Sequence, residues 1–312
     1  MRKVLTMVLY AAALCACPGS CERSPTSSSD VGSAPFTAVL PEWSPFIGVH
    51  AFAARQEVQQ PYLQPLFDSG AVRGIRTDVN HPDTEFFANW AIGQGIDVLA
   101  VFPNEHLRLP NAYETLSNQV RRNPDIKYWE FGNEVSLFVK NPSMGPEEYM
   151  SLFLELYEQA TDEFPDRVFL PMPIFGGSGG SQFLQKMLDY DDGALIKLAN
   201  HPDPGKRLKV LSVHVYGFFG PFVGQVKTQI ERLPYSTEIW ISEVGIEQQS
   251  EHISWVKNNY PQLRDSLRAT RIYWYVFSEC TEFSLIEGLA GACPQDPLKI
   301  SPLYTVLTGG VQ

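Results

Sequence analysis

The chain has 312 residues, of which 44% are hydrophobic and 19% charged, with a net charge of -11. This apolar content is typical of a globular protein with a sizeable core and excludes a disordered chain. The acidic balance argues against nucleic acid and anionic lipid surfaces as partners, because both carry phosphates that a negative surface repels. The length allows one large α/β barrel or two smaller domains.

Residues 1–16 have the pattern of an export signal. Two basic residues, Arg2 and Lys3, precede an apolar run over 4–14 that is too short to span a bilayer. The run ends in Leu14-Cys15-Ala16-Cys17, which resembles a bacterial lipobox. The resemblance implies cleavage before Cys17 and lipidation of its thiol. An ordinary signal peptide cut nearby is the alternative.

Residues 17–42 are rich in Ser, Thr and Pro and predict a flexible tether, because they cannot bury enough apolar surface to order themselves. With a lipid on Cys17, this arrangement predicts an exported lipoprotein of the bacterial cell envelope, attached to the membrane only by its anchor. We expect the protein to be a monomer.

From residue 45 onward, short β-branched or aromatic runs alternate with longer segments of helical period. The predicted strands are, in order, Phe46–Phe52, Val72–Val79, Asp97–Phe102, Lys127–Phe131, Val168–Ile174, Val210–Tyr216, Glu238–Val244 and Arg271–Phe277. Predicted helices include Glu147–Phe164, Phe218–Leu233 and His252–Leu267. This alternation over roughly 265 residues predicts an α/β fold, a (β/α)8 TIM barrel spanning 43–312, with a doubly wound open sheet as its rival.

In such a barrel the functional groups lie at the carboxyl ends of the strands. Those positions hold His50, Arg76, Asn133, Glu134, His214, Tyr216, Glu243, Trp274 and Tyr275. Glu134 and Glu243 end the fourth and seventh strands, which lie on opposite sides of an eight-stranded ring. Cleavage of a glycosidic bond needs two such carboxyl groups, one to protonate the leaving oxygen and one to attack or to activate water. Asn133 and Glu134 are adjacent, so the strand must end or bulge there if both are to face inward.

Several motifs resemble the retaining (β/α)8 glycoside hydrolases that include cellulases, β-mannanases and β-xylosidases. The resemblance spans residues 45–306. It is carried by Asn133-Glu134 after an apolar strand, Ser242-Glu243-Val244-Gly245, Val213-His214-Val215-Tyr216 and Tyr273-Trp274-Tyr275.

The resemblance implies a role for each matching position. Glu134 would be the general acid/base and Glu243 the nucleophile, acting on a β-linked oligo- or polysaccharide without metal or organic cofactor. The implied supporting roles are a hydrogen bond from Asn133 to the substrate, ionisation of Glu243 by Arg76, a hydrogen bond from Tyr216 to Glu243, and a sugar platform formed by Trp274. His214, His50 and Tyr275 are further candidate substrate contacts.

Plainer interpretations stand beside these roles. His214 could be an interior histidine, Trp274 could be barrel packing, and Arg76 could pair with Glu130 or Asp78. We interpret Glu130 as a paired structural carboxylate. Strand alternation predicts that Trp129 and Trp240 pack against the outer helices.

Two other functions are compatible with parts of the sequence. The stretch Gly176-Gly177-Ser178-Gly179-Gly180 fits the nucleophile elbow of a serine esterase, with Asp191 or Asp192 and His214 or His252 as partners. No glycine-rich oxyanion segment precedes it, and the stretch is also typical of a βα loop. The third possibility is a non-catalytic carbohydrate-binding lipoprotein on a barrel scaffold.

Two loop segments are candidate walls of a substrate groove. One is Asn104–Pro110, after the third strand. The other lies between Cys280 and Cys293, which can form a disulfide in an oxidising compartment.

Overall fold

The computed structural model describes residues 47–51, 56–134, 144–174, 178–216, 220–278, 281–287 and 298–309. The predicted signal and tether, and with them Cys17, lie outside the described residues, as do Cys280 and Cys293. Among the described residues, no helix combines the length and apolar character needed to cross a membrane.

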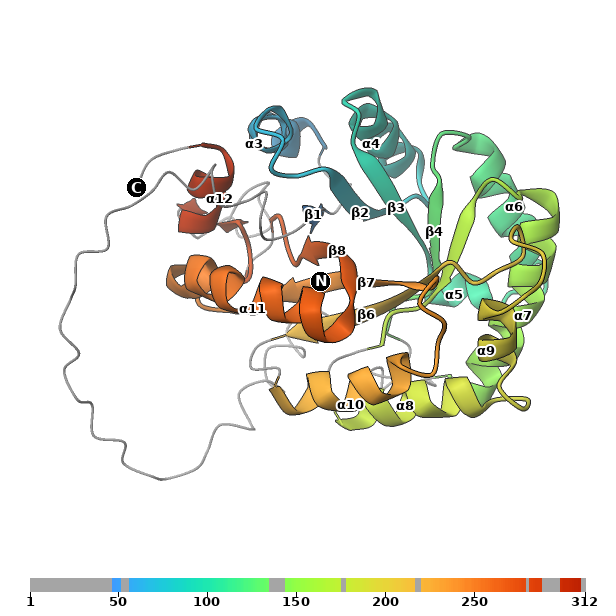
Figure 1. Ribbon diagram of the computed structural model, residues 1–312. Coiled ribbons are helices and arrows are strands. Elements are labelled where there is room, and N and C mark those ends of the chain that lie inside the picture. The colour runs from blue at the N-terminus through green and yellow to red at the C-terminus, as the bar shows by residue number, and fades with distance from the viewer. Residues whose placement is uncertain are drawn as a thin grey trace. The chain divides into compact units, whose positions relative to one another are not determined.

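The central feature is a ring of eight parallel strands surrounded by helices (Figure 1). The strands are β1 (Ile47–His50), β2 (Gly74–Asp78), β3 (Asp97–Phe102), β4 (Tyr128–Phe131), β5 (Val168–Pro171), β6 (Val210–Tyr216), β7 (Glu238–Gly245) and β8 (Ala269–Trp274). Neighbours in the sheet run in the order β5-β4-β3-β2-β1-β8-β7-β6.

The two outer members of that order, β5 and β6, also meet. The amide of His214 donates to the carbonyl of Ile174 at 2.9 Å, and the Ser212 hydroxyl donates to the carbonyl of Pro171 at 2.9 Å. A parallel bridge pairs Ile174 with Val213. These contacts bring the sheet round on itself, so the fold is the predicted (β/α)8 barrel and not an open sheet.

The helices follow the strands along the chain. They are α3 (Gln56–Asp68), α4 (Pro82–Gly93), α5 (Asn104–Leu107), α6 (Ala112–Arg122), α7 (Pro146–Glu163), α8 (Ser178–Asp189), α9 (Ala194–Ala199), α10 (Gly220–Ile230), η3 (Gln249–Glu251), α11 (His252–Leu267) and α12 (Pro302–Leu307). A short antiparallel pair, β9 (Ile286–Glu287) and β10 (Lys299–Ile300), precedes α12. The amphipathic segments predicted from helical period coincide with α7, α10 and α11, because their apolar stripes are what pack on the sheet.

A small apolar cluster fills the inside of the barrel toward the strand beginnings. Its members are Leu99, Tyr128, Val168, Leu170, Val210, Trp240 and Tyr273. Gly48 on β1 makes room for the Tyr273 ring, since a Cβ at that position would lie 2.3 Å from it. The layer therefore places a glycine beside bulky aromatic residues, because the narrow interior of an eight-stranded barrel must be closely packed.

Arg271, near the beginning of β8, covers this layer on the side of the strand beginnings. Its guanidinium lies 4.6 Å from the ring centre of Tyr128 and 4.3 Å from that of Trp240. It also donates to Asp97 at 2.7 Å and to the Tyr128 hydroxyl at 2.9 Å. We call this group of four residues, Arg271, Asp97, Tyr128 and Trp240, the basal plug.

The position of Trp240 corrects one expectation from the sequence. Trp129 packs in the outer core beneath the helices, as predicted, but Trp240 faces the barrel interior and contacts Tyr128 across the ring at 4.9 Å between ring centres. The prediction assumed regular alternation along β7. A bulge in that strand, described below, reverses the phase.

Candidate active site

Glu243 lies near the carboxyl end of β7 and is 3% exposed. Its Oε1 accepts a hydrogen bond from Arg76 Nη1 at 2.6 Å and lies 3.2 Å from His50 Nδ1. Its Oε2 accepts from the Tyr216 hydroxyl and lies 3.4 Å from His214 Nδ1. The carboxylate is thus surrounded at both oxygens by four residues from three other strand ends, a setting that favours its ionised form.

A β-bulge at Ser242 aims Glu243 at this position. In the pairing with β6, Val213 faces Ile241 and His214 faces Glu243, so Ser242 has no partner residue. On the other side, the register between β7 and β8 also shifts between Ile241 and Val244. The extra residue lets Trp240 and Glu243, three positions apart, both face the inside of the barrel, where regular alternation would send them to opposite faces.

Glu134 reaches the same region from a turn that follows β4. The strand ends at Phe131, and Gly132 and Glu134 adopt left-handed backbone conformations with φ of 91° and 46°. A left-handed conformation is uncommon for a glutamate and is kept only where surrounding contacts determine it. The Glu134 side chain is 5% exposed and its Oε1 lies 2.5 Å from His214 Nδ1.

Arg76, near the end of β2, connects Glu243 to the residues at the end of β4. Besides Glu243, its Nε donates to Glu130 Oε2 at 2.7 Å and its Nη2 to Asn133 Oδ1 at 2.8 Å. The sequence left open whether Arg76 pairs with Glu130 or supports Glu243, and the structure has it doing both. Glu130 is completely buried, and this ion pair supplies the partner that such a carboxylate needs.

The two carboxyl groups have opposite electrostatic settings. Burial raises the pKa of Glu134, and the charge of Glu243 raises it further, while His214 acts in the opposite direction. Burial would also raise the pKa of Glu243, but interactions with His214, Arg76 and His50 outweigh it and hold that pKa well below its usual range. Burial, reinforced by the negative charge of Glu243, raises the pKa of Tyr216, so its hydroxyl remains a donor. One glutamate is therefore suited to carry a proton and the other to stay ionised.

Glu134, His214 and Glu243 each offer one donor atom, and these atoms lie within 4.8 Å of one another. Three such donors are a possible metal set, but His214 Nδ1 is already engaged with Glu134, and the Arg76 guanidinium already supplies positive charge to Glu243. We therefore assign the three to a hydrogen-bonded network. The same distance limit brings an oxygen of Glu134 close to an oxygen of Glu243.

The aromatic residue at the end of β8 is not the one expected. Trp274 points outward: its indole N–H donates to the Phe283 carbonyl at 2.9 Å, and its ring lies 4.7 Å from His252 and 5.9 Å from Trp255 on α11. The expectation of Trp274 as a sugar platform is therefore wrong. Tyr275, one residue later, is the aromatic residue that lies beside the glutamate's neighbours, with its ring 5.4 Å from His50 and 5.7 Å from Tyr216.

The esterase interpretation finds no support in the histidines nominated for it. His214 Nδ1 is engaged by Glu134. Both ring nitrogens of His252 are occupied, by the Ser301 hydroxyl at 2.8 Å and by the carbonyls of Ile246 and Glu282. Asp191 and Asp192 follow the end of α8, whereas Ser178 begins that helix, about 18 Å away along its axis.

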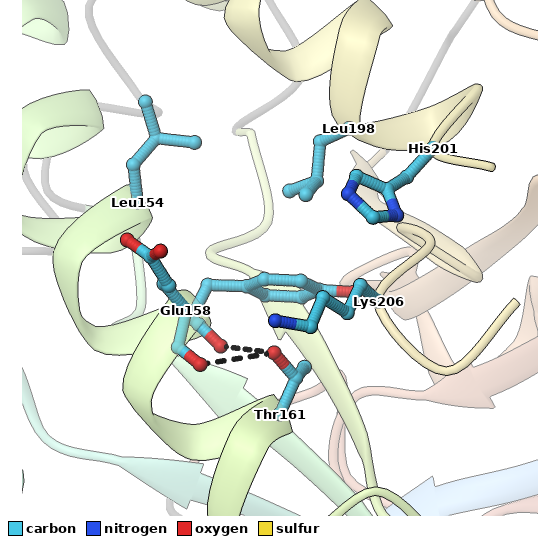
Figure 2. A pocket seen from close by; sticks show the side chains of 7 residues that line it. Leu154, Glu158, Thr161, Leu198, His201 and Lys206 are labelled. Atoms are coloured by element: carbon cyan, nitrogen blue, oxygen red, sulfur yellow. Dashed lines mark hydrogen bonds between the residues drawn. The ribbon is translucent and has the colours of Figure 1, made fainter. Parts of the chain in front are cut away.

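A separate surface pocket of about 230 Å³ lies between α7, α9 and the segment leading to β6 (Figure 2). It is lined by Leu154, Tyr157, Glu158, Thr161, Leu198, His201 and Lys206. Tyr157 is held by its hydroxyl, which donates to the Arg207 carbonyl at 2.7 Å, and Lys206 pairs with Asp162 at 2.5 Å. Its residues come from outer helices and not from the strand ends, so we do not connect it with the glutamates.

Two residues near the site belong to the segments predicted as groove walls, but the sequence predicted no individual role for either of them. Phe283 contacts the rings of Tyr216 and Tyr275, at 5.7 Å and 6.1 Å between ring centres. Asn104, at the start of α5, hydrogen-bonds the backbone of the turn that carries Glu134. Neither could be found from a motif, because both act through contacts with residues distant in sequence.

No model of a known protein family matches the chain, and no curated protein does. Solved structures do. A GH39 enzyme from Xanthomonas axonopodis pv. citri has a TM-score of 0.61 at 10% identity, covering 86% of this chain and 66% of that one. A GH10 endoxylanase from a sugarcane soil metagenome has a TM-score of 0.56 at 11% identity, covering 88% and 98%. A family 51 α-L-arabinofuranosidase from Bifidobacterium longum has a TM-score of 0.55 at 12% identity, covering 84% and 71%. The likeness is in the (β/α)8 barrel fold.

Proposed function

We propose that the protein is a retaining glycoside hydrolase acting on a β-linked glycan. The observation that carries this proposal is the glutamate pair: two buried carboxyl groups with oxygens within 4.8 Å, whose pKa values are displaced in opposite directions. Retaining enzymes place their two carboxyl groups about 5–5.5 Å apart, whereas inverting enzymes need more room for a water molecule. The barrel shared with solved glycoside hydrolases agrees with this assignment.

In the first step, the ionised Glu243 attacks the anomeric carbon and forms a glycosyl ester. Glu134 gives its proton to the glycosidic oxygen as the bond between that oxygen and the anomeric carbon breaks. Arg76, Tyr216 and His50 keep Glu243 ionised and oriented before the attack. Part of the negative charge of Glu243 passes into the ester, which removes one of the influences that raise the pKa of Glu134.

In the second step, Glu134 is the base. It takes a proton from a water molecule, the water oxygen attacks the anomeric carbon, and the ester bond to Glu243 breaks. Two inversions give net retention, and both glutamates return to their starting protonation states. His214 Nδ1, 2.5 Å from Glu134 and 3.4 Å from Glu243, holds the acid/base in place through the cycle.

Asn133 and Tyr275 are the proposed substrate contacts nearest the pair. Arg76 Nη2 donates to the amide oxygen of Asn133. The amide nitrogen is therefore the end that we expect to contact a sugar hydroxyl. The Tyr275 ring, beside His50 and Tyr216, offers the flat apolar face that a pyranose stacks on.

The defining experiment is a hydrolysis screen with the anomer of the product read by NMR. Because the similar structures include both an endoxylanase and an α-L-arabinofuranosidase, the panel should contain xylans, glucans, mannans, galactans and α-L-arabinofuranosides. We expect turnover of a β-linked member with retention. A product of inverted configuration would contradict the proposed double displacement.

Two variants test the individual roles with an activated aryl glycoside of the sugar so identified. Glu243→Ala should lose turnover, and azide or formate should restore part of it by taking the place of the nucleophile, with a product of inverted configuration. Glu134→Ala with azide should instead give a glycosyl azide of retained configuration. Wild-type activity in Glu243→Ala would overturn the proposal.

The same experiment separates the other candidate functions. Hydrolysis of an aryl ester that is lost in Ser178→Ala and unaffected in Glu243→Gln would identify an esterase. Binding of a glycan by the wild-type chain, without cleavage of any member of the panel, would identify a carbohydrate-binding lipoprotein.

We also propose that the chain is exported and lipid-anchored through Cys17, on the strength of the lipobox-like Leu14-Cys15-Ala16-Cys17. Replacing Cys17 with Ser should move the protein from the membrane fraction to the soluble fraction. Unchanged fractionation would contradict the anchor.

A further inference from the structure

The segment that leaves β3 contains a side chain that behaves as part of the sheet. The last regular pairing between β3 and β4 joins Phe102 to Phe131, and the amide of Gly132 donates to the Phe102 carbonyl at 2.8 Å. The next residue of the β3 side, Pro103, has no N–H, and α5 begins directly after it. The backbone of β3 therefore cannot continue the ladder alongside Asn133.

The amide side chain of Asn104 takes the place of that missing backbone. Its Oδ1 accepts the N–H of Asn133 at 2.7 Å, and its Nδ2 donates to the carbonyl of Asn133 at 2.7 Å. A primary amide has the same donor and acceptor as a peptide group, so the side chain satisfies both polar groups of one backbone residue.

The contact also determines the shape of the turn. A Cβ on Gly132 would lie 2.8 Å from Asn104 Oδ1, and Gly132 has a φ of 91°. Glu134, two residues later, has a φ of 46°, a conformation that costs of the order of 1–3 kcal/mol for a residue other than glycine. Between them, Asn133 is fixed on both sides, by Asn104 through its backbone and by Arg76 through its side chain.

We propose that Asn104 is a positioning residue for the general acid: its amide clamps Asn133 so that the left-handed turn presents the Glu134 carboxyl at the barrel mouth. This inference rests on the proposed function, since it assigns the purpose of the clamp to proton transfer by Glu134. Asn104 does not act on the substrate itself. Its loss should misplace the acid while leaving Glu243, held by Arg76 and Tyr216 from other strands, in position.

A misplaced acid has a signature that a general loss of folding does not. Substrates with a poor leaving group need protonation of the glycosidic oxygen, whereas substrates with an activated leaving group depart without it. The test therefore compares kcat/KM for phenyl and 2,4-dinitrophenyl β-glycosides of the sugar that the wild type hydrolyses. The ratio of the two values does not depend on the fraction of folded enzyme.

The variants are Asn104→Ala, Asn104→Asp, Glu134→Gln and the control Asn111→Ala. Asn104→Asp keeps the acceptor for the Asn133 N–H and loses the donor to the Asn133 carbonyl. Asn111 is an exposed asparagine in the same connection between β3 and β4, and its side chain makes no capping hydrogen bond.

We expect Asn104→Ala to lose about 10²-fold on the phenyl glycoside, the cost of misplacing a reacting group by about 1 Å. On the 2,4-dinitrophenyl glycoside it should lose only a few-fold, Asn104→Asp should be intermediate, and Asn111→Ala should match the wild type. Glu134→Gln should show the same selective loss, larger. An equal loss on both substrates in Asn104→Ala, with a selective loss in Glu134→Gln, would overturn the clamp alone. An equal loss in Glu134→Gln would overturn the acid assignment and the proposed function with it.

Discussion

The ends of β4 and β7 both present a glutamate to the barrel mouth, and they do so by different means. At β7 the strand continues through Glu243, and the bulge at Ser242 turns the side chain inward within the sheet. At β4 the strand stops at Phe131, and a left-handed turn held by Asn104 carries Glu134. One carboxyl is positioned by the sheet and the other by a turn attached to it.

The surroundings of the two carboxyl groups differ in the same way. Arg76, Tyr216 and His50 approach Glu243, whereas the Glu134 carboxyl contacts His214 among the described residues. Arg76 donates to Glu243, the proposed nucleophile, and makes no described contact with Glu134, the proposed acid. The comparison shows how a fixed scaffold gives one residue type two protonation states.

Replacing Glu134, the proposed proton donor, should have the largest effect on activity. Glu243 must be ionised and Glu134 protonated, so activity should fall on the acid side as Glu243 gains a proton and on the basic side as Glu134 loses one. Glu134→Gln should lower kcat/KM for a poor leaving group by about 10²–10⁴-fold. On an activated substrate it should retain the acid limb and lose the basic limb. A pH–rate profile measures both, and a basic limb that persists in Glu134→Gln would contradict the assignment.

The contributions of Glu134 and Glu243 to the free energy of unfolding should change in opposite directions with pH. Because the pKa of Glu134 is raised by folding, its contribution to stability is present below its unfolded pKa and is lost as the pH rises. Because the pKa of Glu243 is lowered by folding, its contribution is present above its unfolded pKa and is lost as the pH falls. At pH 7, Glu243→Gln should therefore cost about 3–5 kcal/mol, as expected when a buried ion pair loses one partner.

Glu134→Gln should instead stabilise the fold, by an amount that grows between pH 4 and pH 8. Urea denaturation at several pH values measures both differences. Glu114→Gln, at an exposed position of α6, is the control and should change the free energy of unfolding by less than about 0.5 kcal/mol. Destabilisation by Glu134→Gln at pH 8 would show that the two ends do not differ as described.

A methyl group on Gly132 should disturb only the turn. Gly132→Ala places its Cβ against Asn104 at a φ of 91°, so we expect a loss of about 1–3 kcal/mol in stability and a fall in activity confined to poor leaving groups. Gly93→Ala is the matched control, because a Cβ there meets nothing within 4 Å. Thermal unfolding and the two aryl glycosides used above measure the effects. Equal loss on both substrates would mean that the change reaches Glu243 as well.

The fold could be predicted from the sequence because its signal is repeated. The strand pattern at Asp97–Phe102 and Val210–Tyr216 and the helical period at His252–Leu267 agree with the observed bounds, since a buried parallel strand and an amphipathic helix each require their own spacing of apolar residues. The break in β4 also followed from the sequence, because Asn133 and Glu134 are adjacent and a regular strand cannot aim both inward.

What could not be predicted depends on departures of a single residue. The bulge at Ser242 reversed the orientation expected for Trp240, and after β8 the aromatic residue near the glutamates is the half-buried Tyr275 and not Trp274. Asn104 is invisible to periodicity because a side chain, and not the backbone, continues the ladder there. Each case depends on contacts between segments that are distant in sequence, and the local pattern of residues carries no information about such contacts.

The basal plug has a consequence for how such a protein can change over time. Arg271, Asp97, Tyr128 and Trp240 close the end of the barrel opposite the glutamates, and none of them contributes a contact to Glu134 or Glu243. If the proposed function holds, we expect substitutions that change sugar preference at the mouth to leave the stabilising contacts of the basal plug intact. A laboratory lineage selected for a new glycan can exchange loops at one end while the other keeps the scaffold folded, which makes the plug the part of the chain to preserve during directed evolution.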